Sequence, residues 1–423
     1  MPDGEETHAI KLEPVGGAPD CVIHAKGLTA GRAALRRPED VAVLRCGLVH
    51  HGVVVLDSDS GSDPSQITPS QLHDACMAAF DALELSPGEP PKGRGADSQG
   101  NLRGACFSGF PGTTIIGSAK RLSWHGLEGD IWPTPWWEAR NIEWHQDGAF
   151  SATTSGSPPM ALVSMFCKET PSGGGGQLTW PGTDEALPFA DGATLFYSTK
   201  KALELAAPAL AARARRMVGV YSEGFKNVVE DVYPVMSATG LVPTALPPED
   251  RTGFAPHVPL FDEGASVELG ATLKCEKSVV KYGLVQIAEG RESVLVSALC
   301  LDYLEEDGKP LTWKDSMDFL EQLLGPAACP PHVYAHRWEP GSMVIWDNRV
   351  VQHSVTPYWE HCGVPMHHQR GQRRVLAHTR LVSSWMPSDT PSCNGNQDGD
   401  CTVAREDAAE RATQPEKKRK RVD

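Results

Sequence analysis

The spacing of apolar and polar residues predicts several short strands. GVVVLD, at 52–57, is a β-branched run typical of a buried strand. MALVSMFC, at 160–167, predicts a second strand that enters the glycine run 173–176. GQRRVLAHTRL, at 371–381, alternates apolar and polar side chains, which predicts a strand with two different faces.

The stretch WEPGSMVIWDNR, at 338–349, predicts a turn, a strand and a second turn. Pro340 and Gly341 suit the two central positions of a type II turn, because proline favours the first position and glycine tolerates the second. The apolar run that follows predicts a strand. Asp347 and Asn348 then favour another turn.

Two helices are predicted from their start and end signals. In TPSQLHDACMAAFDAL, at 68–83, Thr68 can cap the helix, a proline suits its first turn, and Gln71 completes a capping box. LTWKDSMDFLEQLLG, at 311–325, predicts a second helix that a terminal glycine ends. The first helix places its apolar residues on one face: Leu72, Cys76, Ala79, Phe80 and Leu83.

Short strands outnumber helices along the chain, which predicts a mainly β fold with flanking helices, built as a sandwich or a barrel. Residues 19–385 show no obvious linker and are expected to form one domain with insertions. Residues 1–18 are polar and rich in proline and glycine, and residues 386–423 contain few large apolar side chains. We expect both ends to be disordered, because they bury too little apolar surface to offset the entropy of ordering.

Composition and charge narrow the class of protein. The chain of 423 residues has a formal net charge of -15, which argues against a broad nucleic-acid-binding surface. No apolar run is long enough to span a membrane and the first residues lack the apolar stretch of a signal peptide, so we expect neither a membrane span nor a secretion signal. The 11 cysteines include no C-x-x-C pair, a pattern typical of reduced thiols inside a cell, so a cytoplasmic location is expected.

The C-terminal end carries one dense basic cluster within QPEKKRKRVD. Such a cluster is compatible with a nuclear-import signal read by an import receptor, and equally with a solvated, disordered terminus. The cluster consists of Lys417, Lys418, Arg419, Lys420 and Arg421.

The stretch NIEWHQDGAF, at 141–150, carries the main chemical signal. His145 and Asp147 are two residues apart, so in extended chain their side chains lie on the same side. An imidazole and a carboxylate at this spacing form the first part of the two-histidine, one-carboxylate triad that binds one face of an octahedral Fe(II). His353, in WDNRVVQHSVTPY, is the candidate third ligand. A surface turn and a buried structural histidine are the alternatives to metal binding.

An arginine near the start of the strand 371–381 completes a more specific pattern. A planar guanidinium binds a carboxylate with two parallel hydrogen bonds and keeps its charge. It would suit the distal carboxylate of 2-oxoglutarate, whose keto acid end can chelate iron. Strand phase favours Arg374, although Arg370, Arg373 and Arg380 compete for this role or are merely surface charges.

In chain order, the motifs WHQDGAF, TPSGGGGQLT and WDNRVVQHSV, followed by RRVLAHTRL, resemble the taurine dioxygenase-like (TauD/TfdA) family of Fe(II)/2-oxoglutarate-dependent dioxygenases. The resemblance covers about residues 25–385 and implies a double-stranded β-helix (jelly-roll) core. It also implies that His145, Asp147 and His353 hold iron and that Arg374 grips the cosubstrate.

Within the family, SWHGLEG and HVYAHRWEPGSMVIWDNRVVQHSV look most like the fungal xanthine dioxygenase branch. A lysine that this branch uses on its substrate has no counterpart after LEG, where the chain reads DIWPTPWW. His378 stands where taurine-type enzymes place an arginine. His378 and Arg380 are candidate substrate-binding residues, because alternate residues of that strand share a face with Arg374. Gln177 and Thr179 both stand near the position of a family threonine that touches the cosubstrate.

The resemblance implies that 2-oxoglutarate and O2 yield succinate and CO2 while a small polar or anionic molecule, xanthine-like or sulfonate-like, is hydroxylated. Two alternatives stay open, a non-catalytic metal and 2-oxoglutarate sensor on the same fold and a zinc-dependent cupin-like hydrolase. The loop EHCGVPMHHQRG has no metal-finger spacing and favours a solvated loop over a zinc site. Trp132, Trp136 and Trp137 are compatible with stacking on a flat substrate and with core packing.

Overall fold

The structure is a computed structural model, and it describes only part of the chain. The chain divides into two compact units, Met1–Ser392 and Cys393–Asp423, and every described residue lies in the first. The described residues are 10–58, 63–86, 106–107, 110–117, 142–148, 159–170, 175–180, 184–190, 192–221, 279–298, 301–356 and 375–381.

An 8-stranded sheet forms the largest layer, with the strand order β1-β2-β3-β18-β7-β20-β5-β4. Neighbouring strands are antiparallel except for β2 and β3, which run parallel. The strands are β1 (Lys11–Pro14), β2 (Val22–Thr29), β3 (Val53–Asp57), β4 (Cys106–Phe107), β5 (Phe110–Gly117), β7 (Leu162–Glu169), β18 (Met343–Asp347) and β20 (Val375–Leu381).

A 4-stranded antiparallel sheet faces this large sheet, with the order β17-β10-β19-β6. One buried cluster joins the two, because it contains Phe196 of the small sheet and Trp346 of the large one, with ring centroids 5.3 Å apart. The core therefore fills the space between two sheets that pack face to face. The strands of the small sheet are β6 (Ile142–His145), β10 (Thr194–Ser198), β17 (Tyr334–His336) and β19 (Val351–Val355).

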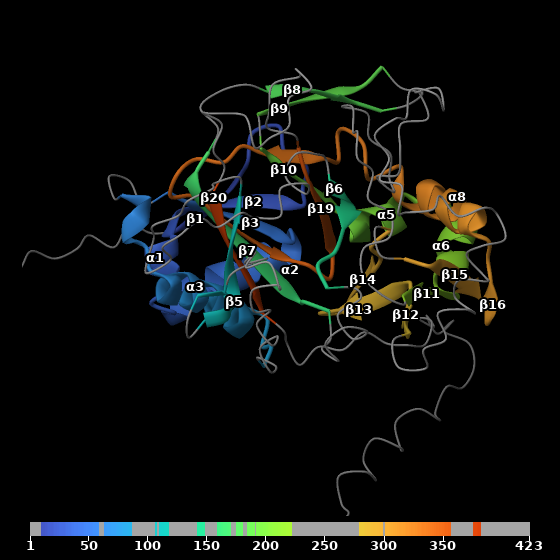
Figure 1. The fold of residues 1–423 in the computed structure, drawn as a ribbon, viewed down its shortest axis with the longest axis horizontal. Coiled ribbons are helices and arrows are strands. Elements are labelled where there is room, and N and C mark those ends of the chain that lie inside the picture. Colours follow the sequence, from blue (N-terminus) through green and yellow to red (C-terminus); the bar gives the residue numbers. More distant parts are fainter. Residues whose placement is uncertain are drawn as a thin grey trace, which may run out of the picture. The chain divides into compact units, whose positions relative to one another are not determined.

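The central strands of the large sheet are buried on both faces, and their side chains alternate between two cores. On β18, Val344 and Trp346 join the cluster between the sheets, whereas Met343 and Ile345 join a cluster formed with helices. This alternation is the period of an extended chain. Figure 1 shows these helices beside the large sheet: α1 (Ala30–Ala33), α2 (Pro38–His50) and α3 (Pro69–Ala82).

A third buried cluster lies among a second group of helices and short strands. Helix α5 (Thr199–Leu205) continues directly from β10 and packs against β14 and α8, and α6 (Pro208–Ala214) also contacts α8. Figure 1 shows α6 and α8 beside β11, β15 and β16. The remaining elements are η1 (Pro64–Gln66), β8 (Gly175–Thr179), β9 (Ala186–Ala190), β11 (Met217–Tyr221), β12 (Val280–Gly283), β13 (Val285–Ala288), β14 (Arg291–Val294), β15 (Tyr303–Glu306), β16 (Lys309–Pro310) and α8 (Trp313–Leu324).

The predicted mainly β fold with flanking helices is confirmed among the described residues. The strands predicted at 52–57, 160–167 and 371–381 correspond to β3, β7 and β20. Gly341 has a φ of 88°, and the Ser342 N–H donates to the Glu339 carbonyl at 2.9 Å, as a type II turn requires.

Both predicted helices are also present. Thr68 caps α3, and its backbone N–H donates to the Gln71 side chain at 2.9 Å, so the capping box is complete. The five residues that we placed on one face of α3 all lie in the cluster with the large sheet. Helix α8 ends at Gly325, which keeps a right-handed conformation with a φ of -49°.

One expectation about the chain ends is wrong in part. We expected residues 1–18 to be disordered, but Lys11–Pro14 form β1, and all four residues of β1 pair with β2. Leu12 packs against the helical cluster, so even a short polar segment finds apolar surface at the sheet edge. Residues 1–9 and 386–423 lie outside the described residues, and their disorder stays a prediction. Among the described helices, none is long and apolar enough to cross a membrane.

Candidate metal centre

The pairing of β6 with β19 places two histidines side by side. His145 and His353 are register partners on these antiparallel strands, and their ring centroids are 4.2 Å apart. Asp147 follows two residues after His145, in the turn where β6 has ended, and Gly148 then takes a φ of 74°. A contact between residues more than 200 positions apart is thus made by one strand pair.

The three side chains point their donor atoms at one another. Asp147 Oδ1 is 3.8 Å from His145 Nε2, and Asp147 Oδ2 is 3.9 Å from His353 Nε2. These separations are too long for hydrogen bonds between the pairs. All three donor atoms lie within 4.8 Å of one another, and within the described part of the chain no other group of three such ligands was found. Two imidazoles and one carboxylate are donors that suit a transition metal.

Apolar and aromatic side chains surround the histidine of β19. His353 is buried and lies 4.9 Å from the Trp346 ring and 6.3 Å from the Phe196 ring, measured between centroids. Trp144, which precedes His145, is also fully buried and meets Tyr197 edge to face at 4.7 Å. Aromatic rings therefore cover His353 on the side of the core, and this low-dielectric surrounding strengthens its electrostatic interactions.

Comparison with known proteins shows the family of this chain. The family model described as "Taurine catabolism dioxygenase TauD, TfdA family" matches residues 25–372. This chain belongs to the TauD, TfdA family. The match includes His145, Asp147 and His353, and the predicted resemblance is confirmed at the level of the family.

Individual relatives match this TauD-family chain over shorter stretches. It is similar to an (S)-phenoxypropionate/alpha-ketoglutarate-dioxygenase of Sphingobium herbicidovorans, with 37% identity over 68 residues, 16% of this chain and 20% of that protein. It is also similar to a pentalenolactone F synthase of Streptomyces arenae, with 37% identity over 65 residues, 15% of this chain and 20% of that protein. The matched part of the chain therefore spans about a fifth of the length of these curated relatives.

A solved structure also resembles the TauD-family chain. It is a taurine dioxygenase from Burkholderia xenovorans, with 17% sequence identity and a TM-score of 0.48, and the match covers 89% of this chain and 90% of that one.

Two glutamines next to the histidines in sequence bind the backbone of Val296 in the TauD-family chain. Gln146 follows His145, and its Oε1 accepts from the Val296 N–H at 2.7 Å. Gln352 precedes His353, and its Nε2 donates to the Val296 carbonyl at 2.5 Å. Because neighbouring residues of a strand point to opposite faces, these amides tie down the side of the strand pair that faces away from the ligands.

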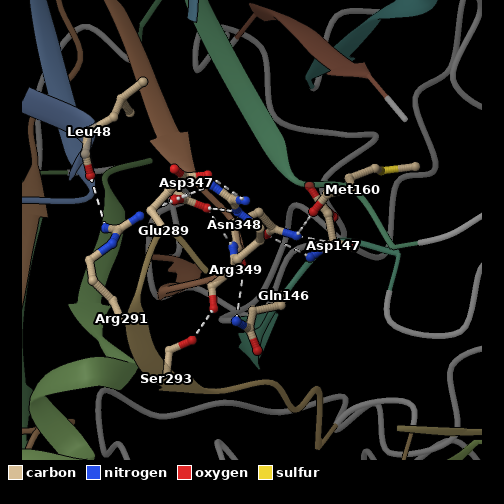
Figure 2. Close-up of polar contacts among 10 residues, drawn as sticks. All are labelled: Leu48, Gln146, Asp147, Met160, Glu289, Arg291, Ser293, Asp347, Asn348 and Arg349. Carbon is tan, nitrogen blue, oxygen red and sulfur yellow. Dashed lines mark hydrogen bonds and ion pairs between the residues drawn. The ribbon is translucent and has the colours of Figure 1, made fainter. Parts of the chain in front are cut away.

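A fully buried turn connects β18 of the large sheet to β19. The Asp347 carboxylate accepts from Arg349 Nε at 2.8 Å and from an Arg291 guanidinium nitrogen at 2.8 Å (Figure 2). Burial raises the pKa of Asp347, but the charges of Arg349 and Arg291 and the hydrogen bonds from Arg349 outweigh it and hold that pKa below its usual value. Glu289 lies 3.5 Å from Arg349 and balances its second side. The two carboxylates and the two guanidinium groups of this network therefore balance in formal charge.

Asn348, in this turn, binds both the backbone N–H and the backbone carbonyl of Asp147 through its side-chain amide. The sequence predicted a turn at Asn348 but no role for its side chain. A weak signal was present, since asparagine in a buried turn must satisfy two donors and one acceptor. The sequence could not say which backbone groups those are, because they lie about 200 residues away.

The other predicted site residues are only partly described. Gln177 lies on β8 with an exposed side chain, and Thr179 ends that strand. On β20, His378 and Arg380 are register partners of Met165 and Val163, two residues of the cluster between the sheets. Arg374 lies outside the described residues, one position before β20 begins.

Three further predictions also fall outside the described residues. They concern the histidine-rich loop EHCGVPMHHQRG, the tryptophans Trp132, Trp136 and Trp137, and the basic cluster 417–421. The cysteines with described side chains are free: Cys21, Cys46, Cys76, Cys167 and Cys329.

Proposed function

We propose that this chain is an Fe(II)- and 2-oxoglutarate-dependent dioxygenase that hydroxylates a small polar or anionic molecule. One observation carries the proposal, the convergence of His145, Asp147 and His353 on a common centre within a chain of the TauD, TfdA family. The two histidines come from paired strands and the carboxylate from the adjoining turn, so the ligands share one side of the centre.

The residues present fit a ferrous ion. Two imidazoles and one carboxylate bind one face of Fe(II) and leave positions for other ligands. When bound, iron together with 2-oxoglutarate supplies the activation of O2, with succinate and CO2 as the products of the cosubstrate. The chain's own contribution is to hold the three ligands, to exclude water with the aromatic wall around His353, and to orient the molecule to be oxidised.

We assign Arg374 to the distal carboxylate of 2-oxoglutarate, with Gln177 or Thr179 as the second contact. A guanidinium suits this role because it forms two parallel hydrogen bonds with a carboxylate. His378 and Arg380 are proposed to contact the substrate. Their register partners on β7, Met165 and Val163, belong to the cluster between the sheets. The proposed scaffold is a double-stranded β-helix (jelly roll).

The substrate class that we propose is a small polar or anionic molecule, xanthine-like or sulfonate-like. Histidine and arginine at the two substrate positions favour an anion or a polar heterocycle over a neutral lipid. A net charge of -15 disfavours a nucleic-acid substrate. The phenoxypropionate in the name of one relative is also a small anion, which agrees with this class.

The direct test is succinate release by the full chain after anaerobic purification. The reaction contains Fe(II), ascorbate, 2-oxoglutarate and O2, with xanthine, taurine or a phenoxypropionate added in separate arms. We expect succinate formation that requires Fe(II), 2-oxoglutarate and O2 and that one small-molecule class stimulates, whereas ascorbate only keeps the iron reduced. His353→Ala should abolish it, because two ligands hold the ion far more weakly than three.

Ser316→Ala is the matched control. Ser316 is fully buried and hydrogen-bonded to Thr312 and Leu304, in α8 and away from the metal centre. This variant should lose stability but keep the activity of the folded fraction. A chain that binds Fe(II) and 2-oxoglutarate without any succinate release would instead be a sensor. Turnover that requires zinc and continues without O2 would identify a hydrolase. Either result overturns the proposal.

A further inference from the structure

We propose that Asn348 is a positioning residue that holds Asp147 in place for metal binding. The inference rests on the proposed metal centre and goes beyond it, because Asn348 itself is not a ligand. Asp147 lies beyond the end of β6, so the ladder between β6 and β19 does not hold it. A carboxylate ligand in a turn beyond the ladder needs a constraint on its backbone to stay in register with two histidines on strands.

The Asn348 side chain supplies that constraint through three hydrogen bonds. Its Oδ1 accepts from the Asp147 N–H at 3.0 Å, and its Nδ2 donates to the Asp147 carbonyl at 3.0 Å and to the Met160 carbonyl at 2.7 Å. Figure 2 shows the amide between Asp147 and Met160. The two bonds to Asp147 resemble one rung of an antiparallel ladder, made by a side chain where the strand has stopped.

The backbone of Asn348 also forms hydrogen bonds near Asp147. Its N–H donates to the Ala161 carbonyl at 2.9 Å, and its carbonyl accepts from Gln146 Nε2 at 2.8 Å. The residue is completely buried, with 0% of its surface exposed. Every donor of this side chain and its acceptor oxygen therefore have a protein partner, and no other residue type offers two donors and one acceptor in the same shape.

The turn that carries Asn348 is itself immobilised by charge. Asp347 and Arg349, on either side of it, form a buried ion pair, and Arg291 and Glu289 extend this pair to the hairpin β13–β14. Arg291 also donates to the Leu48 carbonyl near the end of α2 at 3.2 Å. Figure 2 shows this network around the turn. Through these contacts and its own hydrogen bonds, Asn348 connects Asp147 to the large sheet and to α2.

The test measures metal binding rather than turnover. The full chain, stripped of metal, is titrated with Co(II) alone at neutral pH, and the visible absorption of the bound ion gives both affinity and coordination. Asn348→Asp keeps the acceptor for the Asp147 N–H but loses both donor bonds, and Asn348→Ala loses all three. Loss of a residue that orients a ligand weakens metal binding by about 10- to 100-fold. We expect Co(II) affinity to fall by this factor in both variants, more in Asn348→Ala, with an altered absorption spectrum.

Urea unfolding of each metal-free variant shows that the titrated protein is folded, and Ser316→Ala again serves as control. Its affinity for Co(II) should equal that of the wild type although its stability falls. If the Asn348 variants are folded and bind Co(II) with the affinity and spectrum of the wild type, Asn348 has no positioning role. If the wild type itself fails to bind Co(II), the metal centre is wrong, and the proposed function fails with it.

Discussion

His336 leads to a quantitative prediction about acid stability. It lies on β17, only 4% exposed, with its ring 4.5 Å from that of Trp338 and its Nδ1 3.0 Å from the Tyr334 hydroxyl. Burial lowers the pKa of His336 from 6.5 to about 3, and the nearby His24 adds to this effect. The folded protein therefore keeps this imidazole neutral at pH values where an unfolded chain protonates it.

The sign and size of the effect follow from proton linkage. The pKa is depressed in the folded state, so the stability that it contributes is present above pH 6.5 and is lost as the pH falls toward 3. Within this window each pH unit costs about 1.4 kcal/mol of unfolding free energy. Between pH 7.5 and 5.0 the loss from this one group is about 2 kcal/mol.

The assay is urea unfolding at pH 7.5 and 5.0, with a chelator present so that metal binding does not contribute. His336→Asn removes the titration but keeps a polar atom near the Tyr334 hydroxyl. The wild type should lose about 2 kcal/mol more than this variant between the two pH values. Tyr334→Phe removes the hydroxyl but leaves the imidazole, so it should keep the pH dependence of the wild type. Equal losses in the wild type and His336→Asn would refute the reasoning.

Three further predictions concern the buried turn, the metal ligands and a helix end. Arg349→Met leaves the buried Asp347 with one cation fewer and should lower the unfolding free energy by about 3–5 kcal/mol, measured in urea, whereas a loss below about 1 kcal/mol would show that the pair is not buried as described. Co(II) at 100 times its dissociation constant should raise the unfolding free energy of the wild type by about 2.7 kcal/mol and leave that of His353→Ala unchanged. A wild type whose urea midpoint is the same with and without Co(II) would contradict this. Thr68→Ala removes the cap of α3 and should cost about 1 kcal/mol, with Ser70→Ala, an exposed position in the same turn, as the control expected to stay near zero.

Local features of this protein were determined by the sequence itself. Thr68, Pro69 and Gln71 specify the start of α3, because a cap and its partner are three residues apart and need no distant contact. Pro340 and Gly341 specify their turn for the same reason, through the φ angles that these residues favour. The spacing of His145 and Asp147 predicted two ligands on one side of an extended segment, which also depends on local geometry alone.

Only the tertiary structure decided which distant groups meet. The pairing of β6 with β19 sets His353 opposite His145, and no local preference encodes that register. The partners of the Asn348 and Gln146 side chains are backbone groups that every residue possesses, so no side-chain pattern marks them in advance. β1 forms because a sheet edge was available to pair with it, although its own composition resembles a disordered end. Long-range pairing is governed by the burial of whole faces, and that becomes visible only when the sheets are assembled.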